Sequence, residues 1–301
     1  MPIDPPHRPR RLAFLGTPEA AVPSLRALVA AGFDVALVVS QPDRRRGRGQ
    51  ATSPTPVKAA ALELGLPVTD RTDDVLEAGV ELGVVVAYGE ILRASVLDAV
   101  PMVNVHFSLL PAWRGAAPVE RALLAGEATT GVCVMEVVEA LDAGGVHARA
   151  EVPITSTSTA GGLRAQLADV GAEVLVRTLE EGLGRPEPQV GEPTYAKKIT
   201  SEDLHLDWTR PAVELDRVVR VGGAWTTFRD KRLRIWSAAG AEGDAAAVEP
   251  GLVDVTDGDV VVAAGTGGLV LREVQPEGKA RQPAADWANG ARLTPDDRLG
   301  P

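Results

Sequence analysis

Three polar side chains in the middle of the chain have the types and spacing of an acid–base site. Asn104 and His106 are two residues apart in the β-branched-rich run Met-Val-Asn-Val-His-Phe-Ser of residues 102–108, which predicts a short strand. Because side chains two apart on a strand share a face, the amide and the imidazole point the same way. Asp142 follows in the stretch Leu-Asp-Ala-Gly-Gly at residues 141–145. Together an amide donor, an imidazole and a carboxylate suit the stabilisation of an oxyanion during proton transfer.

Each of these residues taken alone has a structural explanation. A single histidine on a strand more often belongs to a core, and an aspartate close to glycine is usually a turn residue. Here the three occur together, and a rigid Leu-Leu-Pro segment follows at the carboxyl end of the predicted strand. That edge is where open α/β sheets place ligands. The combination therefore favours a catalytic site over three unrelated structural residues.

The elements that must position these residues alternate between strand and helix. Apolar runs predict buried strands at residues 12–15, 35–39 and 84–87, and helices at residues 23–31, 56–64 and 91–100. This alternation indicates right-handed βαβ crossovers and an α/β fold, namely a Rossmann-like, doubly wound, mostly parallel sheet with helices on both faces. The first strand ends in Gly-Thr-Pro and lacks the G-x-G-x-x-G fingerprint, which disfavours a nicotinamide dehydrogenase.

The second half of the chain has a different texture. A long helix is predicted over residues 159–183, after which proline and glycine become frequent and indicate a linker. One helix over residues 211–221 then precedes short strand candidates separated by glycine-rich turns, the pattern of a small barrel. We therefore expect a catalytic domain at residues 1–184, a linker at 185–205 and a smaller β-barrel domain at 206–301.

Composition narrows the class of protein. The chain has 301 residues, of which 45% are hydrophobic, and no apolar run approaches the roughly 18 residues of a membrane span. The basic, proline-rich start lacks the apolar segment of a secretory signal. The one cysteine, Cys133, excludes an internal disulfide and fits a reducing compartment, so we expect a cytoplasmic protein.

Charge is unevenly distributed along the chain. The net charge is −10, yet residues 1–60 hold nine Lys or Arg against four Asp or Glu. Four of these basic residues are Arg44, Arg45, Arg46 and Arg48, which lie among glycines. Such a run is often plain solvated surface, but arginines on a flexible loop can also bind phosphates and stack on bases. An acidic protein with one basic patch favours a focused polyanion contact over indiscriminate binding.

Several motifs occur here in the order of one known family. They include Asn-Val-His-Phe-Ser-Leu-Leu-Pro-Ala-Trp-Arg-Gly-Ala-Ala-Pro at residues 104–118, Leu-Asp-Ala-Gly-Gly at 141–145 and Tyr-Ala-Lys-Lys-Ile at 195–199. With these motifs the chain resembles the folate-dependent formyltransferases over residues 11–293. The resemblance implies an OB-like C-terminal barrel. It is nearest to the branch that transfers a formyl group from 10-formyltetrahydrofolate to the α-amino group of initiator methionyl-tRNA, for translation initiation.

The resemblance also implies roles for residues. Asn104 and His106 would stabilise the oxyanion, and Asp142 would raise the proton affinity of the imidazole and relay the amine proton. The folate would contact Ser108, Leu109, Leu110, Pro111, Val86, Tyr88, Ile91 and Leu92. The loop with Arg44, Arg45, Arg46 and Arg48 would enter the acceptor end of the tRNA, and the C-terminal domain would add contacts. We expect direct transfer without a metal or covalent intermediate, by a monomer that needs no membrane.

Two departures from the family pattern and two rival functions need testing. Phe107 stands where the family usually has glycine, so its ring either narrows the pocket or points to the opposite face, as strand alternation predicts. Residues 219–225 replace an Asn-Pro-Trp-Pro-like run. One rival is an N-formyltransferase for a nucleotide-linked amino sugar, which would share Asn, His and Asp but has no need of the arginine loop. An inactive tRNA- or folate-binding module would be expected to lose part of this triad.

Overall fold

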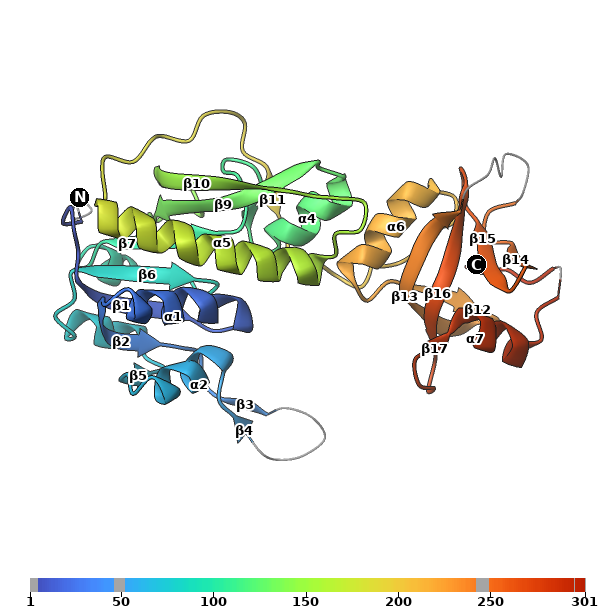
Figure 1. Ribbon diagram of the computed structural model, residues 1–301, viewed down its shortest axis with the longest axis horizontal. Helices are drawn as coiled ribbons and strands as arrows, with labels where there is room; N and C mark the ends of the chain where they lie inside the picture. Colours follow the sequence, from blue (N-terminus) through green and yellow to red (C-terminus); the bar gives the residue numbers. More distant parts are fainter. Residues whose placement is uncertain (1–4, 46–51, 242–248, 295, 301) are drawn as a thin grey trace. The chain divides into compact units, whose positions relative to one another are not determined.

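The chain folds into two compact units, each with its own core (Figure 1). The computed structural model describes residues 5–45, 52–241, 249–294 and 296–300. The first unit comprises Met1–Val119, Thr129–Ile154 and Leu163–Lys197, and the second comprises Glu120–Ala128, Thr155–Gly162 and Lys198–Pro301. Residues 185–197, from the expected linker, fall in the first unit. The limits of the functional domains stay a prediction.

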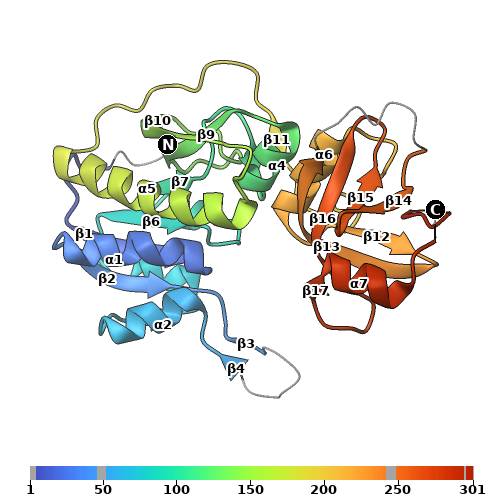
Figure 2. The ribbon, with the colours of Figure 1, turned by 45° about the vertical axis from the view of Figure 1, so that its right-hand side comes forward.

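A seven-stranded sheet forms the centre of the first unit, with the strand order β10-β9-β7-β6-β1-β2-β5 (Figure 2). The strands are β1 (Arg11–Gly16), β2 (Asp34–Val39), β5 (Val68–Thr69), β6 (Leu82–Val86), β7 (Met102–His106), β9 (Thr129–Glu136) and β10 (Val146–Pro153). Neighbours from β7 to β5 pair in parallel, whereas β9 pairs antiparallel with both β7 and β10. The predicted mostly parallel, Rossmann-like sheet is therefore confirmed.

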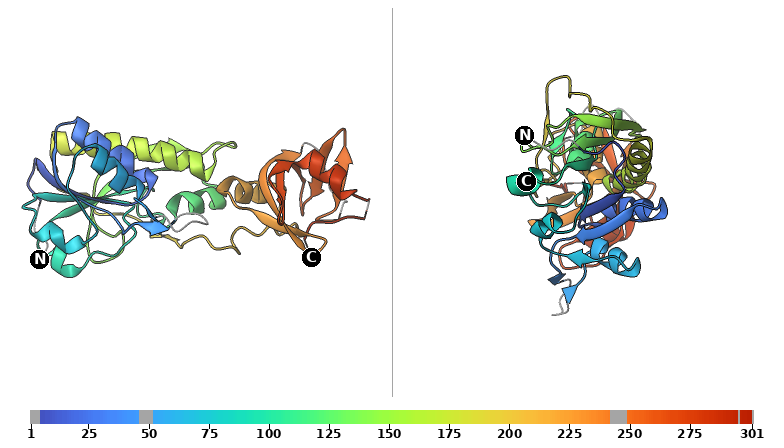
Figure 3. Two further views of the ribbon diagram at one scale, coloured as in Figure 1. Left: turned by 90° about the horizontal axis from the view of Figure 1, so that it is seen from below. Right: turned by 90° about the vertical axis from the view of Figure 1, so that its left-hand side faces the viewer.

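Helices cover both faces of this sheet, as expected for a doubly wound fold (Figure 3). The helices and 3-10 helices of this unit are η1 (Glu19–Ala21), α1 (Val22–Ala30), α2 (Pro56–Glu63), η2 (Thr72–Leu76), α3 (Ala94–Leu97) and most of α5 (Ala160–Glu181), whereas α4 (Pro118–Ala125) falls mainly in the second unit. Helices α1 and α5 lie over one face and α3 over the other. The helix predicted at residues 91–100 is wrong in length, because only four residues of it are helical. Arg93 before it is extended, and Pro101 soon after cannot continue a helix.

Strand alternation decides where the ring of Phe107 points. A Cβ atom added to Gly171 of α5 would lie 2.8 Å from Cγ1 of Val105 and 3.6 Å from Cε1 of Phe107. Val105 and Phe107 therefore face α5, and His106 between them faces the other side of the sheet. The large residue fills space against a helix that has no side chain at this point, and it lies away from the face of β7 that carries Asn104 and His106.

The chain order reverses its direction beside β1, in the middle of the sheet. From β1 the chain moves outward to β2 and β5, and then returns to β6 on the other side of β1. This reversal of direction is the topological switch point, where open α/β sheets bind ligands. The segments after β1 and β6 are tied together here, since the Thr17 hydroxyl donates a 3.0 Å hydrogen bond to the carbonyl of Tyr88. His106 ends the neighbouring strand β7.

The second unit contains a curled antiparallel sheet with two helices packed on it (Figure 2). Its elements are α6 (Ala212–Val221), β12 (Trp225–Phe228), β13 (Lys231–Ala241), β14 (Val253–Thr256), β15 (Asp259–Ala263), β16 (Gly268–Pro276), β17 (Gln282–Pro283) and α7 (Ala284–Ala291). Trp208 and Trp287 are buried in its core with Ile235. The indole of Trp208 donates a 3.0 Å hydrogen bond to the buried hydroxyl of Thr226. The barrel-like C-terminal part is thus confirmed.

Candidate active site

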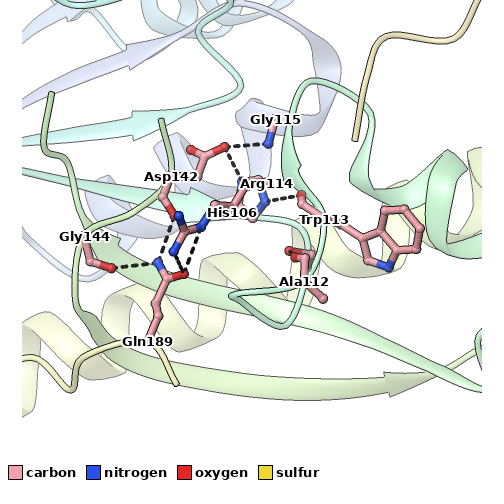
Figure 4. Close-up of polar contacts among 9 residues, drawn as sticks. His106, Ala112, Trp113, Arg114, Gly115, Asp142, Gly144 and Gln189 are labelled. Carbon is pink, nitrogen blue, oxygen red and sulfur yellow. Dashed lines mark hydrogen bonds and ion pairs between the residues drawn. The ribbon is translucent and has the colours of Figure 1, made fainter. Parts of the chain in front are cut away.

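His106 is buried at the end of β7, with 6% of the residue exposed, and one of its ring nitrogens is already engaged. Nε2 lies 3.0 Å from the carbonyl oxygen of Trp113 (Figure 4). A carbonyl oxygen can only accept, so Nε2 carries the proton and donates it to this bond. The other nitrogen, Nδ1, lies 3.7 Å from Oδ2 of Asp142. Nδ1 is therefore the nitrogen left for chemistry.

The surroundings of His106 favour a neutral ring at neutral pH. Burial lowers the pKa of His106 below its ordinary value of about 6.5, while the Asp142 carboxylate and the bond to the Trp113 carbonyl act in the opposite direction. The expected effect of Asp142 on proton affinity is present, but burial outweighs it. With the proton on Nε2, Nδ1 presents a lone pair beside a carboxylate. Such a nitrogen can accept a proton and be stabilised once it becomes charged.

Asp142 is held by one backbone hydrogen bond to its carboxylate and by the close packing of its own loop. Its Oδ2 accepts a 2.7 Å hydrogen bond from the backbone N–H of Gly115, which lies in β8 (Arg114–Gly115). Its own backbone is in the left-handed region, with φ of 47°. Gly144, two residues later, has no room for a side chain, because a Cβ atom there would lie 2.1 Å from the carbonyl oxygen of Glu136. The glycine-flanked sequence is thus required by close packing of the loop.

Asn104 occupies the position that the strand pattern predicts. It lies two residues before His106 on β7, in register with Val85 of β6 and Met135 of β9. It is partly exposed, unlike the buried residues on either side of it. Two residues along a strand correspond to about 7 Å, so its amide can reach an atom that also approaches Nδ1 of His106. The structure brings His106 and Asp142 within 3.7 Å and places Asn104 on the same face.

The Leu-Leu-Pro segment after β7 is shaped by two buried residues and exposes two others. Ser108 is fully buried, and its hydroxyl donates a 2.6 Å hydrogen bond to the carbonyl of Ala112. Leu110 belongs to a core cluster with Cys133. Leu109 and Pro111 are partly exposed. As folate contacts all of these stay predictions, and only Leu109 and Pro111 offer side-chain surface to a ligand.

The turn after β6 presents backbone more than side chains. Val86 is buried, and the ring of Tyr88 is buried with its hydroxyl 2.9 Å from that of Thr72, so neither side chain is available to a ligand. Burial also raises the pKa of the Tyr88 phenol. Ile91 is 89% exposed, which is unusual for a large apolar side chain, whereas Leu92 packs on the core. An exposed backbone turn with one apolar side chain suits a flat heterocycle rich in donors and acceptors.

The arginine loop is only partly described. Arg44–Arg45 form the short strand β3, which pairs antiparallel with β4 (Thr52–Ser53). Arg46 and Arg48 lie outside the described residues. Close in sequence to β3 and β4, Lys58 and Asp43 form an ion pair of 2.9 Å. The contacts of all four arginines with tRNA stay a prediction.

Two residues of the site were not singled out from the sequence. Arg114 belongs to the Trp-Arg-Gly motif but had no assigned role, and Gln189 lies in the expected linker. The guanidinium of Arg114 donates hydrogen bonds of 3.1 and 2.7 Å to Oε1 of Gln189. In turn, Nε2 of Gln189 donates to the carbonyls of Asp142 and Gly144. Neither composition nor periodicity near residue 189 gave a signal for this contact.

The geometry suits acyl transfer between two nitrogen atoms. A neutral Nδ1 beside a carboxylate can take a proton from an attacking amine and return it to a leaving amine. The Asn104 amide can donate to an oxygen that becomes anionic. Among residues 5–45, 52–241, 249–294 and 296–300, no group of three or more His, Cys, Asp or Glu could hold a metal ion. Within the same ranges, no helix has the length and apolar character needed to cross a membrane.

Family comparison agrees with this assignment. Residues 10–179 match the formyl transferase family, and residues 198–292 match the formyl transferase C-terminal domain. The chain belongs to the formyl transferase family. One relative, the methionyl-tRNA formyltransferase of Symbiobacterium thermophilum, is 44% identical over 311 residues, which cover 97% of this chain and 95% of the relative. The methionyl-tRNA formyltransferase of Thermobifida fusca is also 44% identical, over 310 residues that cover 96% and 99%.

Solved structures share the formyl transferase fold. HypX from Aquifex aeolicus, in complex with tetrahydrofolic acid, matches with a TM-score of 0.65 at 18% identity, and the match covers 93% of this chain but only 47% of HypX. An N-formyltransferase from Helicobacter canadensis, in complex with folinic acid and dTDP-3-aminofucose, matches with a TM-score of 0.67 at 14% identity, over 86% of this chain and 98% of that one. At these identities the likeness establishes the fold alone.

Proposed function

We propose that this protein transfers the formyl group of 10-formyltetrahydrofolate to the α-amino group of initiator methionyl-tRNA. The observation that carries the proposal is the 44% identity to methionyl-tRNA formyltransferases over nearly the whole length of both chains. The amino-sugar alternative has weaker support, because the N-formyltransferase from Helicobacter canadensis in complex with dTDP-3-aminofucose is only 14% identical. Such a function would place the protein in the cytoplasm as a soluble enzyme, in keeping with its lone buried Cys133.

The first half of the reaction requires a neutral amine and a polarised carbonyl. An α-amino group titrates near 8, so a usable fraction is neutral at pH 7 without a strong base. As the amine attacks the formyl carbon, its nitrogen becomes positively charged and the formyl oxygen negatively charged. Nδ1 of His106 accepts a proton from that nitrogen, and the resulting imidazolium is stabilised by Asp142 at 3.7 Å. The Asn104 amide and the new Nδ1–H then donate to the oxyanion.

The second half of the reaction returns the same proton. The carbon–N10 bond breaks as the oxyanion collapses to the new formamide, and N10 needs a proton to leave as an amine. Nδ1–H supplies it, directly or through a water, which restores neutral His106. Each turnover thus ends with the ring in its starting state. Because the bond from Nε2 to the Trp113 carbonyl persists throughout, the ring keeps one orientation while Nδ1 gains and loses the proton.

The proposed folate site is the turn after β6 together with the segment after β7. Its support is the exposed backbone of Ala87 and Gly89, the exposed side chain of Ile91 and the partly exposed Leu109. These surfaces lie at the switch-point edge where α/β sheets bind ligands. Val86 and Tyr88 would contribute only backbone groups to this site, because the side chains of both residues are buried.

The proposed tRNA contacts are the arginine loop and the outer face of the C-terminal barrel. In that domain Arg232 lies 4.2 Å from the ring centroid of Trp225. Cations beside aromatic rings suit a phosphate backbone with exposed bases. Arg229 and Arg281 are poorer candidates, because Arg229 makes two hydrogen bonds of 2.9 and 2.8 Å to the carboxylate of Asp297 and Arg281 forms an ion pair with Glu273.

A salt series tests the tRNA contact. We expect kcat/KM for methionyl-tRNA to fall steeply as salt rises, since each phosphate that is neutralised releases counterions. Arg48→Ala should lower kcat/KM strongly with little effect on folate binding. Arg45→Ala and Arg46→Ala should each reduce the log–log slope by about one unit for a phosphate contact. If the plots of log kcat/KM against log salt concentration superimpose for wild type and all three variants, the loop has no role in tRNA binding, and the amino-sugar alternative must be considered again.

A further inference from the structure

We propose that Gln189 is a positioning residue for catalysis, which holds the Asp142 loop at the distance from His106 that proton transfer needs. The inference rests on the proposed function, since it assigns to Gln189 the support of a pair of residues that move a proton. Gln189 itself touches neither the His106 ring nor the Asp142 carboxylate. Its contacts are with the backbone of the loop that carries Asp142 and with Arg114 (Figure 4).

Hydrogen bonds fix both ends of the Gln189 amide. Nε2 donates 2.8 Å bonds to the carbonyl oxygens of Asp142 and Gly144. Oε1 accepts from Nε and Nη2 of Arg114 at 3.1 and 2.7 Å. The reverse orientation would aim the carbonyl at two carbonyls and the NH₂ group at a cation, so only one orientation satisfies all four contacts. A glutamine with every contact satisfied in one orientation holds the loop rigidly.

Arg114, a partner of Gln189, lies between the two residues whose backbone groups bind the His106 ring and the Asp142 carboxylate. Arg114 is flanked by Trp113, whose carbonyl holds the His106 ring, and by Gly115, whose N–H holds the Asp142 carboxylate. Gln189 thus joins the segment that aligns both side chains to the loop that carries one of them. The loop needs such support, because Asp142 is a non-glycine residue with φ of 47°.

The segment around Gln189 is itself anchored to the first unit. Glu187 and Val146 exchange two backbone hydrogen bonds of 2.8 and 2.9 Å. Further along, β11 (Tyr195–Ala196) pairs in parallel with β8. The stretch expected to be a linker therefore runs against the active site at these points and presents Gln189 to it between the two anchors. Gln189 is thereby fixed in place where its amide binds the Asp142 loop.

Replacement of Gln189 by methionine tests the inference. Gln189→Met keeps the length of the side chain and removes all four hydrogen bonds, whereas Val190→Ala is a matched control at a neighbouring position that is 86% exposed. We expect Gln189→Met to lower kcat about 10- to 100-fold with KM for both substrates within about threefold, because the loss is one of alignment and not of binding. Val190→Ala should match wild type.

A second measurement separates positioning from a merely structural role and does not depend on activity. In Gln189→Met the carboxylate can move away from Nδ1, so the pKa of His106 measured by NMR should fall below that of wild type. Arg114→Lys, which keeps the charge but loses the two-pronged contact, should shift both kcat and this pKa in the same direction. If Gln189→Met does not fold, Arg114→Lys serves as the test variant in its place.

The outcomes distinguish this inference from the proposed function. If wild type does not formylate methionyl-tRNA, the proposed function fails, and the NMR titration alone still decides whether Gln189 positions Asp142. If wild type is active but a folded Gln189→Met keeps kcat within about twofold and leaves the His106 titration unchanged, the inference is overturned. A loss of activity that tracks a loss of folded protein, with the same His106 titration, would also overturn it.

Discussion

Substitution of Asp142 by asparagine removes one charge from the site and changes little else. The asparagine side-chain oxygen can still accept the hydrogen bond that Gly115 donates to Asp142, so the loop should keep its conformation. The neutral ring of His106 is little affected by the missing charge. The imidazolium that forms during the reaction, in contrast, loses its counterion at 3.7 Å. The change therefore acts mainly on the transition state.

The distance sets the size of the expected effect. Two unit charges 3.7 Å apart attract by about 4 kcal/mol at an effective dielectric constant of about 20. The carboxylate is 14% exposed, so water weakens the attraction somewhat. Since about 1.4 kcal/mol corresponds to a factor of ten in rate, we expect kcat to fall by roughly 10²–10³. Asp142→Ala and His106→Ala should cost at least as much, since each removes the side chain outright.

Single-turnover formyl transfer at pH 7.5, with enzyme in excess over methionyl-tRNA, measures this effect on the chemical step. The control is Asp98→Asn, which removes a charge from an exposed aspartate of the same unit and should behave as wild type. Folate binding, followed by fluorescence, should be unchanged in both variants. A rate for Asp142→Asn within tenfold of wild type would show that the carboxylate does not stabilise a charged His106, and the proton relay would have to be abandoned.

Three further predictions follow from individual contacts. Gly144→Ala should lower kcat about 100-fold by displacing the Asp142 loop, whereas Gly161→Ala, where an added Cβ meets nothing, should not; steady-state kinetics checks both. Trp208→Phe leaves the buried hydroxyl of Thr226 without its partner and should lower the free energy of unfolding of the second unit by about 1–3 kcal/mol in urea titrations. Because burial lowers the pKa of His106, the unfolded chain binds a proton at a higher pH than the folded chain does. The free energy of unfolding should therefore fall as pH drops through about 6.5 toward the lowered pKa. Urea titrations at pH 7.5 and 5.5 should show a smaller loss in His106→Asn than in wild type.

Much of the fold follows from local patterns in the sequence. Buried parallel strands are continuous apolar runs, so β1, β2 and β6 could be predicted from residues 12–15, 35–39 and 84–87. The pair β9 and β10 was not predicted, although residues 131–135 are apolar and residues 146–152 alternate apolar and polar side chains with the period of a half-buried strand. The short helix α3 was overestimated, because helical periodicity continued into a loop that tertiary contacts shape.

The positions of the proposed catalytic residues are more predictable from the sequence than the contacts that support them. Strand alternation places Asn104 and His106 on one face, and the two glycines that follow Asp142 at positions 144 and 145 predict a tight loop. The partner of Nε2 could not be predicted, because it depends on a turn in which Trp113 has φ of 61°. The contacts of Gln189 join it to residues 45 and 75 positions away in the sequence. Contacts at such separations leave no local pattern.

The most direct test of the account is a formyl-transfer assay that offers purified wild-type protein two acceptors with 10-formyltetrahydrofolate. The acceptors are initiator methionyl-tRNA and a dTDP-linked amino sugar, with uncharged tRNA as the blank, and the product is identified by mass spectrometry after release from the tRNA. The account predicts one N-formylmethionine for each tetrahydrofolate released. It also predicts that kcat/KM for methionyl-tRNA exceeds kcat/KM for the amino sugar by a factor of at least about 10³, because a site that excludes the wrong polar acceptor discriminates strongly. Faster formylation of the amino sugar, or tetrahydrofolate release without N-formylmethionine, would contradict it.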